Sequence, residues 1–218
     1  KNKKTLFIWP EGIFYESYLH DLKKYKNLFS DTFSKNHLIV LGINNFVNFD
    51  NVKNKKYFNS LVVINHKAEI LSVYNKINLV PFGEFLPFEN FFSKIGLKKI
   101  TRGYNSFTTG DDRSIINLGS EFNKRLILPL ICYEIIYPGN IKKNNEYPDL
   151  VVNISEDGWF GNSIGPFQHF SKAIFRSIEE GIFIARAANK GISGFINPNG
   201  IVIKSLNTGT QGVIELDF

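Results

Sequence analysis

Three short stretches of this chain are predominantly apolar. They cover residues 37–44, 126–131 and 149–154, and polar residues bound each of them. Runs of this length without polar alternation are typical of strands that are buried on both faces, as in the sheets of α/β proteins. Apolar residues recur at three- and four-residue spacing over residues 14–33 and again from residue 165 onward, which predicts two helices. The chain is therefore expected to have an α/β (α+β) fold.

The other apolar segments predict additional strands. Residues 56–65 and 68–74 favour a hairpin, which indicates a mixed sheet, whereas the polar residues 45–56 favour a loop. Short strands are also predicted over residues 5–8, 114–118, 182–188, 191–197, 200–205 and 212–218. The chain has 218 residues, of which 43% are hydrophobic, with no internal repeat and no linker, so we expect one domain over residues 1–218.

The chain is basic, with a net charge of +6. Its lysines cluster near residues 1–4, 23–26, 53–56 and 94–99, without the Arg-rich helix or the aromatic-interleaved basic face that favours nucleic-acid binding. We therefore expect no nucleic-acid partner. Attraction to an anionic membrane surface is a secondary interpretation of the same charge.

No apolar run reaches the ~18 residues of a membrane-spanning helix, and no signal-peptide core is present. Methionine is absent from the chain, even at position 1. We therefore expect the chain to be an interior piece of a larger protein, with its membrane-anchoring segments outside this sequence.

Cys132 is the single cysteine and directly follows the apolar run of residues 126–131. A thiol at the end of a strand, at the start of a turn, is accessible to substrate, and N–H groups of that turn can face a developing oxyanion. This position fits a nucleophile. The alternative is a buried structural thiol, because free cysteine is among the most buried residue types. A single cysteine excludes an internal disulfide and a cysteine-based zinc cluster.

Glu11 follows the first predicted strand in the motif WPEG. Pro10 cannot donate to a strand ladder, so the strand ends there. Glu11 then lies at the carboxyl end of a strand, where open α/β sheets keep their active sites. The alternative is an acid placed at the start of the helix predicted over residues 14–33, where a carboxylate is favourable.

Lys76 ends the second strand of the predicted hairpin and precedes a loop that contains proline and glycine. An inward-facing lysine at this point would stabilise an oxyanion or lower the pKa of a thiol. An ordinary surface lysine is the alternative. Glu84 follows in the same loop and either orients Lys76 or is exposed. Residues 82–92 are rich in phenylalanine, which predicts a packed lid or a hydrophobic contact surface.

The four histidines show no metal-binding spacing. They are His20, His37, His66 and His169. Polar surface or local hydrogen bonding is the expected role of each, and we expect neither a metal nor another cofactor.

The order of Glu11, Lys76 and Cys132 resembles the Glu-Lys-Cys triad of the nitrilase (carbon–nitrogen hydrolase) superfamily. The flanking motifs WPEG, YNKINLVPFGEFLP, LPLICYE and NISEDGWFGNSIGPFQHF, followed by IARAANKGIS, resemble its apolipoprotein N-acyltransferase branch. The resemblance covers nearly the whole chain. It departs from the pattern of the branch at Glu156, where an asparagine is usual, and at Ala188, where a threonine is usual.

The resemblance implies a nitrilase-type αββα sandwich of mixed sheets flanked by helices. It also implies a location on the periplasmic face of the bacterial inner (cytoplasmic) membrane, with transmembrane helices before and after the domain. The implied reaction moves a fatty acyl chain from a phospholipid, through a cysteine thioester, to the N-terminal amine of a diacylglyceryl-cysteine apolipoprotein. The implied partners are therefore a phospholipid acyl donor, an apolipoprotein acceptor and the membrane.

In this reaction Glu11 would act as general base, Lys76 would stabilise the thiolate and the oxyanion, and Cys132 would carry the acyl chain. The Phe-rich loop would exclude water, which distinguishes a transferase from a hydrolase. Supporting roles are predicted for Glu84, Tyr133 and Glu134, and substrate contacts for Trp159, Phe82 and Phe85.

Two other functions remain open. A soluble amidase or nitrilase would use the same triad with water as the final acceptor, and would hydrolyse a small amide. A non-catalytic binding module that kept the fold would leave Cys132 unreactive toward thiol alkylation near neutral pH.

Overall fold

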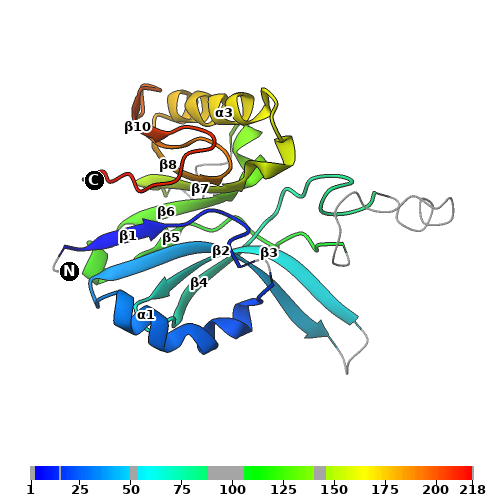
Figure 1. Ribbon diagram of the computed structural model, residues 1–218, viewed down its shortest axis with the longest axis vertical. Coiled ribbons are helices and arrows are strands. Elements are labelled where there is room, and N and C mark those ends of the chain that lie inside the picture. Colours follow the sequence, from blue (N-terminus) through cyan, green and yellow to red (C-terminus); the bar gives the residue numbers. More distant parts are fainter. Residues whose placement is uncertain (1–2, 15, 50–53, 88–105, 140–145, 218) are drawn as a thin grey trace.

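The computed structural model describes residues 3–14, 16–49, 54–87, 106–139 and 146–217. Its strands form two sheets that face each other (Figure 1). One sheet has the strand order β1-β2-β3-β4, and the other has the order β10-β9-β8-β7-β6-β5. The strands are β1 (Thr5–Ile8), β2 (His37–Phe49), β3 (Asn54–Asn65), β4 (Ile70–Asn75), β5 (Ile116–Asn117), β6 (Leu126–Ile131), β7 (Leu150–Glu156), β8 (Phe183–Asn189), β9 (Ser193–Ile196) and β10 (Val202–Leu206).

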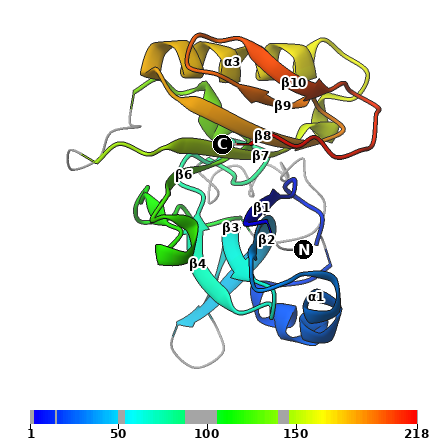
Figure 2. The same cartoon turned by 90° about the vertical axis from the view of Figure 1, so that its left-hand side faces the viewer.

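Helices cover the outer faces of the two sheets. The long helix α3 (Gly165–Glu180) lies on the six-stranded sheet, and η1 (Leu19–Tyr25) with α1 (Lys26–Thr32) lies on the four-stranded sheet (Figures 1 and 2). Three short 3₁₀ helices complete the described elements: η3 (Ser120–Phe122), η4 (Cys132–Ile136) and η5 (Asp157–Phe160). The order of layers is therefore helix, sheet, sheet, helix, which confirms the expected αββα sandwich.

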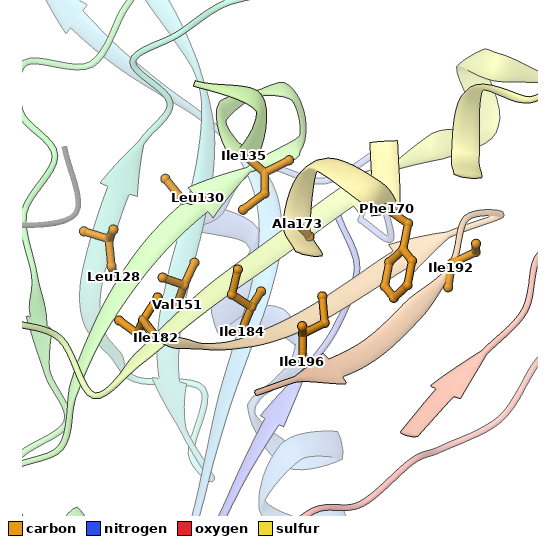
Figure 3. Packing of buried hydrophobic residues seen from close by; sticks show 10 residues of the cluster. All are labelled: Leu128, Leu130, Ile135, Val151, Phe170, Ala173, Ile182, Ile184, Ile192 and Ile196. Atoms are coloured by element: carbon orange, nitrogen blue, oxygen red, sulfur yellow. The ribbon is translucent and has the colours of Figure 1, made fainter. Parts of the chain in front are cut away.

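Apolar side chains fill each of the three interfaces between these layers. The cluster between α3 and its sheet includes Leu130, Val151, Phe170 and Ile184 (Figure 3). A second cluster lies between the sheets, and a third lies under η1 and α1. The runs over residues 126–131 and 149–154 contribute to both faces of their sheet, which explains why they show no polar alternation.

The middle of the six-stranded sheet is parallel. Strands β6, β7 and β8 run in the same direction, with Ile131 beside Ile154 and Glu156 beside Asn189. In the other sheet β1 runs parallel to β2. Carboxyl ends of parallel strands share one edge of a sheet, so the residues that follow β6, β7 and β8 meet at a single edge.

The predicted helix over residues 14–33 is shorter than expected. It begins at Leu19 as the 3₁₀ helix η1 and becomes α-helical only in α1. Tyr18 forms a β-bridge with Asn44 of β2, and its N–H donates to Asp21 Oδ2 over 2.9 Å. Tyr18 is therefore tied to the sheet, and the helix begins only after it.

The loop predicted over residues 45–56 is wrong. Strands β2 and β3 continue through most of it as an antiparallel hairpin, with Phe46 opposite Tyr57. Their rings lie 6.1 Å apart, and the ring of Tyr18 packs edge-on against Phe46 at 5.0 Å. Cross-strand aromatic contacts thus outweigh the polar composition of this segment.

The closing strand predicted over residues 212–218 is not formed by the described residues 212–217. Side chains hold this tail instead of a backbone ladder: Lys3 Nζ donates to Glu215 Oε1 over 2.9 Å and to Asp217. The predicted strand over residues 114–118 is also shorter, and forms only β5. Within the described ranges no helix is long and apolar enough to cross a bilayer.

Candidate active site

Cys132 occupies the first position of η4, directly after β6 ends at Ile131. Its φ is +52°, in the left-handed region. That conformation costs a residue with a Cβ about 1–2 kcal/mol, so surrounding contacts must hold it. One of these contacts is the N–H of Ile131, which donates to Glu134 Oε2 over 2.8 Å.

Glu134 links the turn at Cys132 to the segment that follows β4. Its Oε1 accepts from the Tyr74 hydroxyl at 2.7 Å, from the Ile77 N–H at 2.9 Å and from Arg113 Nη2 at 3.2 Å. The residue is buried. A buried carboxylate with this many donors fixes two segments that are far apart in the sequence.

Lys76 lies in that second segment, in the interior. It is only 1% exposed, so the surface-lysine alternative is excluded. Its Nζ lies 3.0 Å from Glu84 Oε1 and 2.8 Å from Glu84 Oε2. Glu84 Oε2 also accepts from the Val80 N–H over 2.8 Å, which closes the loop around the lysine.

Glu11 lies in a turn after β1, outside any helix, so it is not the helix-start acid of the alternative interpretation. Its Oε1 accepts from Asn59 Nδ2 at 2.6 Å, and its Oε2 accepts from the Glu156 N–H at 2.9 Å. The same Asn59 amide donates to Glu84 Oε1 over 2.8 Å. Asn59 therefore connects Glu11 to the carboxylate that holds Lys76.

A close approach of two backbones makes this position of Glu11 possible. A Cβ built on Gly42 of β2 would lie 2.8 Å from the Cα of Glu11. Glycine at this point lets the turn after β1 lie directly on the neighbouring strand.

The charges of the three residues act on one another. Burial and the repulsion of Glu84 raise the pKa of Glu11, although Lys76 opposes the shift. Burial of the Cys132 thiol and the negative charge of Glu11 raise its pKa to about 12, again against the effect of Lys76. Burial lowers the pKa of Lys76, but Cys132, Glu11 and Glu84 outweigh it and raise that pKa overall.

These shifts define what the site can do chemically. Lys76 stays a cation at physiological pH and can stabilise negative charge on a sulfur or an oxygen. The thiol of Cys132 is neutral at rest, so it can attack only if a base removes its proton. Glu11 is the carboxylate whose charge acts on that thiol, and its raised pKa makes it a stronger base than an ordinary glutamate.

The predicted substrate contacts lie near the surface. Trp159 is 67% exposed in η5, and Phe82 is 43% exposed with a φ of +63°. Phe85 is half-buried, and its carbonyl accepts from the Phe82 N–H over 2.7 Å. The ring of Tyr133 packs edge-on against Tyr137 at 5.7 Å. Residues 88–92 of the predicted lid lie outside the described residues.

Sequence reasoning missed a group of buried polar residues around the site. Asn59 connects two carboxylates, and further polar side chains lie behind Cys132. A signal was present for Asn59, Asn153, Ser155 and Arg186, because a polar residue within an apolar strand is costly unless it is hydrogen-bonded. His169 lies in the helix α3 and gave no such signal. The residues behind Cys132 are Asn153, Ser155, Asp157, His169 and Arg186.

Neither a metal site nor the detected cavity offers an alternative to this site among the described residues. Among the described residues no group of three or more His, Cys, Asp or Glu could hold a metal ion. A cavity of about 810 Å³ is lined by β1, by the starts of β6, β7 and β8, and by the tail over residues 212–217. Its lining does not include Glu11, Lys76 or Cys132.

Comparisons with known proteins identify the family of the chain. The model of the carbon-nitrogen hydrolase family matches residues 5–218. An apolipoprotein N-acyltransferase from Rhodopseudomonas palustris is 44% identical over 158 residues, which are 72% of this chain and 29% of that protein. One from Rhizobium leguminosarum bv. trifolii is 32% identical over 213 residues, which are 98% of this chain and 39% of that protein. The chain thus spans well under half the length of these relatives.

Solved structures of the nitrilase superfamily share the fold. An amidase from Nesterenkonia AN1, as a cysteine-to-serine mutant, has a TM-score of 0.59 at 14% identity over 94% of this chain and 74% of its own. A second structure of the Nesterenkonia sp. AN1 amidase carries a covalent acetamide adduct on its active-site cysteine. It has a TM-score of 0.57 at 14% identity, over 93% of this chain and 73% of its own.

Proposed function

The chain belongs to the carbon–nitrogen hydrolase family, and on that premise we propose that it is the catalytic part of an apolipoprotein N-acyltransferase. It would move a fatty acyl chain from a phospholipid to the N-terminal amine of a diacylglyceryl-cysteine apolipoprotein. The observation that carries the proposal is the hydrogen-bonded connection of Glu11 to the buried Lys76 through Asn59 and Glu84, beside a cysteine at a strand end whose pKa responds to both charges. The names of the relatives supply the choice of reaction within the family.

The first half-reaction acylates the enzyme. As Glu11 takes the thiol proton, the sulfur of Cys132 attacks the carbonyl carbon of a phospholipid ester. Lys76 stabilises the tetrahedral oxyanion, and the loss of one such interaction typically costs about 3–4 kcal/mol in the transition state. The ester C–O bond then breaks, Glu11 returns the proton to the departing oxygen, and the lysophospholipid leaves.

The second half-reaction uses the thioester. The α-amine of the apolipoprotein attacks the thioester carbon, and Glu11 takes a proton from the nitrogen. The C–S bond breaks, the sulfur of Cys132 regains the proton, and an amide is released. The reaction uses no metal and no other cofactor, since the attacking sulfur, the base and the cation are all side chains of this chain.

The substrates imply a membrane location. A phospholipid donor and a lipid-modified acceptor both reside in a bilayer, so we propose that the domain works at the periplasmic face of the bacterial inner membrane. Two exposed aromatic residues, Trp159 in η5 and Phe82 in the loop that contains Glu84, suit contact with acyl chains. Limited proteolysis of spheroplasts and of inverted vesicles should cleave the domain only in spheroplasts.

The proposal is tested by mass spectrometry of the protein, digested after incubation with a phospholipid. We expect the proteolytic fragment that contains Cys132 to gain the mass of one acyl chain. It should lose that mass when a diacylglyceryl-cysteine peptide is added as acceptor before digestion. Glu11→Gln, Lys76→Ala and Cys132→Ala should each abolish turnover. A Cys132→Ala protein that still transfers acyl groups would reject the assignment.

A soluble amidase is the second candidate, because the solved structures that share the fold are of an amidase. It predicts hydrolysis of a small amide and an acyl adduct that water removes without added peptide. A protein that gives neither an acyl adduct on Cys132 nor amide hydrolysis would instead be a binding module.

A further inference from the structure

A buried cluster of charged and polar side chains lies behind Cys132, and the proposed reaction does not use it. Asp157 Oδ2 accepts from Arg186 Nη2 over 2.8 Å, and Asp157 Oδ1 lies 2.9 Å from His169 Nδ1. Ser155 Oγ donates to the same Oδ1 over 2.7 Å. All four residues are buried. Ionic groups buried at this depth carry a large desolvation cost, so their arrangement calls for a role.

The cluster contacts the main chain of the nucleophile directly. His169 Nε2 lies 3.2 Å from the carbonyl oxygen of Cys132. A carbonyl oxygen can only accept, so Nε2 must carry a proton in this contact. On its other side His169 Nδ1 lies 2.9 Å from Asp157 Oδ1, which can only accept, so the imidazole is held between Asp157 and the Cys132 carbonyl. Arg186 fixes the carboxylate of Asp157 through Nη2.

A second contact lies two residues earlier in the chain. Asn153 Nδ2 donates to the carbonyl of Leu130 over 3.1 Å, and Asn153 Oδ1 accepts from Arg186. Arg186 Nε also donates to the carbonyl of Ile192 over 3.3 Å, which fixes the guanidinium itself. The carbonyls on both sides of the strand end are therefore bound to one rigid network.

We propose that His169 is a positioning residue for Cys132: its Nε2–H holds the Cys132 carbonyl and thereby fixes the left-handed turn that aims the thiol at Glu11 and Lys76. Asp157 and Arg186 serve this role by fixing the imidazole. A displacement of about 1 Å at a reacting atom can cost about 100-fold in rate, so such a clamp has a measurable effect. The inference rests on Cys132 being the nucleophile, as proposed above.

Burial has the largest effect on the pKa of the Cys132 thiol, and four groups around it act on that pKa as well. They are Glu11 after β1, Lys76 after β4, Ser155 in β7 and Arg186 in β8. His169 contacts the main-chain carbonyl of Cys132, so its replacement by a neutral amide is expected to act on the position of the thiol.

Two matched variants separate positioning from packing and charge. In His169→Gln the amide nitrogen can occupy the place of Nε2 and keep the donor to the Cys132 carbonyl. In His169→Asn the amide nitrogen can occupy only the place of Nδ1 and keep the contact with Asp157. Both replacements put a neutral amide in place of the imidazole. They differ only in whether the contact with the Cys132 carbonyl or the contact with Asp157 is kept.

The readout is the burst of p-nitrophenolate released when the intact protein reacts with p-nitrophenyl butyrate, an activated ester that acylates Cys132 without phospholipid. We expect the burst rate of His169→Gln to stay within about threefold of wild type, and that of His169→Asn to fall by about tenfold or more. Iodoacetamide labelling of the Cys132 peptide and a thermal melt establish that each variant is folded with its thiol intact.

Equal burst rates for the two folded variants, whether both are fast or both are slow, would overturn the proposal. NMR of the unmodified protein provides a test without variants, since the Nε2 proton of His169 should be visible and protected from exchange. An unprotonated Nε2 would also overturn it. A wild type that reacts with the ester but not with phospholipid would reject the proposed function and leave this comparison intact.

Discussion

At the scale of single residues, the resting thiol of Cys132 is the central feature. Its pKa is raised to about 12 by burial and by the charge of Glu11, so almost none of it is thiolate at neutral pH. Many cysteine nucleophiles are activated by a lowered pKa. In the proposed reaction the proton must therefore leave during the attack, which makes the position of Glu11 as important as its charge.

Glu11→Gln is therefore expected to lower two measured quantities, the rate of acyl transfer and the pKa of the Cys132 thiol. Acyl transfer should fall by about 10²–10⁴-fold, because the general base is lost. The pKa of the Cys132 thiol should also fall, because the negative charge that raises it is removed. Iodoacetamide labelling as a function of pH reports this pKa, and Lys76→Met should shift it upward. A thiol pKa that rises in Glu11→Gln would contradict the electrostatic account.

Gly110 packs closely against the end of β4, next to Lys76. A Cβ at this position would lie 2.2 Å from the carbonyl oxygen of Asn75, and the Gly110 N–H donates to the carbonyl of Lys76 over 2.9 Å. Gly110→Ala must therefore displace the end of β4 and the lysine that follows it.

We expect the burst with p-nitrophenyl butyrate to slow by about tenfold or more in Gly110→Ala, because small displacements of catalytic groups are costly. Gly212→Ala is the matched control, since its Cβ would meet only Leu206 at an ordinary 3.5 Å. Equal rates in the two variants would show that the approach of Gly110 does not position Lys76.

At the scale of elements, η4 depends on a carboxylate within its own first turn. Glu134 binds the N–H of Ile131, the hydroxyl of Tyr74 and the guanidinium of Arg113, and so connects β6 to the segment after β4. Removal of one partner from a buried ion pair leaves an uncompensated charge and typically costs about 3–5 kcal/mol.

Glu134→Gln should therefore lower the free energy of unfolding by an amount of that order, about 3–5 kcal/mol. It should also slow acylation of Cys132, because the turn at the nucleophile loosens. Chemical denaturation and the ester burst measure the two effects. Glu121→Gln, an exposed acid in η3, is the control and should change neither. A fully stable and fully active Glu134→Gln would refute the linking role.

Elements whose signal is local could be predicted from the sequence. The buried runs that became β6 and β7, and the proline-started helix α3, were recognisable because apolar periodicity and Pro166 act within a few residues. The extension of β2 through Phe46 could not be recognised from the sequence, since it depends on Tyr18 and Tyr57 from other segments. The role of His169 could not be recognised for the same reason, because its partners lie on three other elements.

At the scale of the whole molecule, the site is assembled across the two sheets. Glu11 and Lys76 follow strands of the four-stranded sheet, whereas Cys132 and the cluster behind it belong to the six-stranded sheet and α3. The order of Glu11, Lys76 and Cys132 along the chain predicts that they meet because each follows a strand, and in the structure Glu11 follows β1, Lys76 follows β4 and Cys132 follows β6. The buried cluster that supports Cys132 could be inferred only once the strands β7 and β8 were in register.

That cluster also couples the fold to pH through Asp157. Burial alone would raise the pKa of Asp157, but the hydrogen bond from His169 and the charge of Arg186 outweigh it and lower that pKa. A carboxyl whose pKa is lower in the folded state stabilises the fold above its unfolded pKa of about 3.9. The contribution is lost as pH falls through the lower folded value.

Asp157→Asn should therefore cost about 3–5 kcal/mol of unfolding free energy at pH 7, since it leaves Arg186 buried without its ionic partner. The difference between wild type and variant should shrink as the pH falls below about 4, because wild type then loses the same charge by protonation. Urea denaturation at a series of pH values measures this difference. The exposed Asp31→Asn is the control and should show no measurable difference at any pH. A wild-type advantage that stays constant down to pH 3 would mean that the charge of Asp157 does not support the fold.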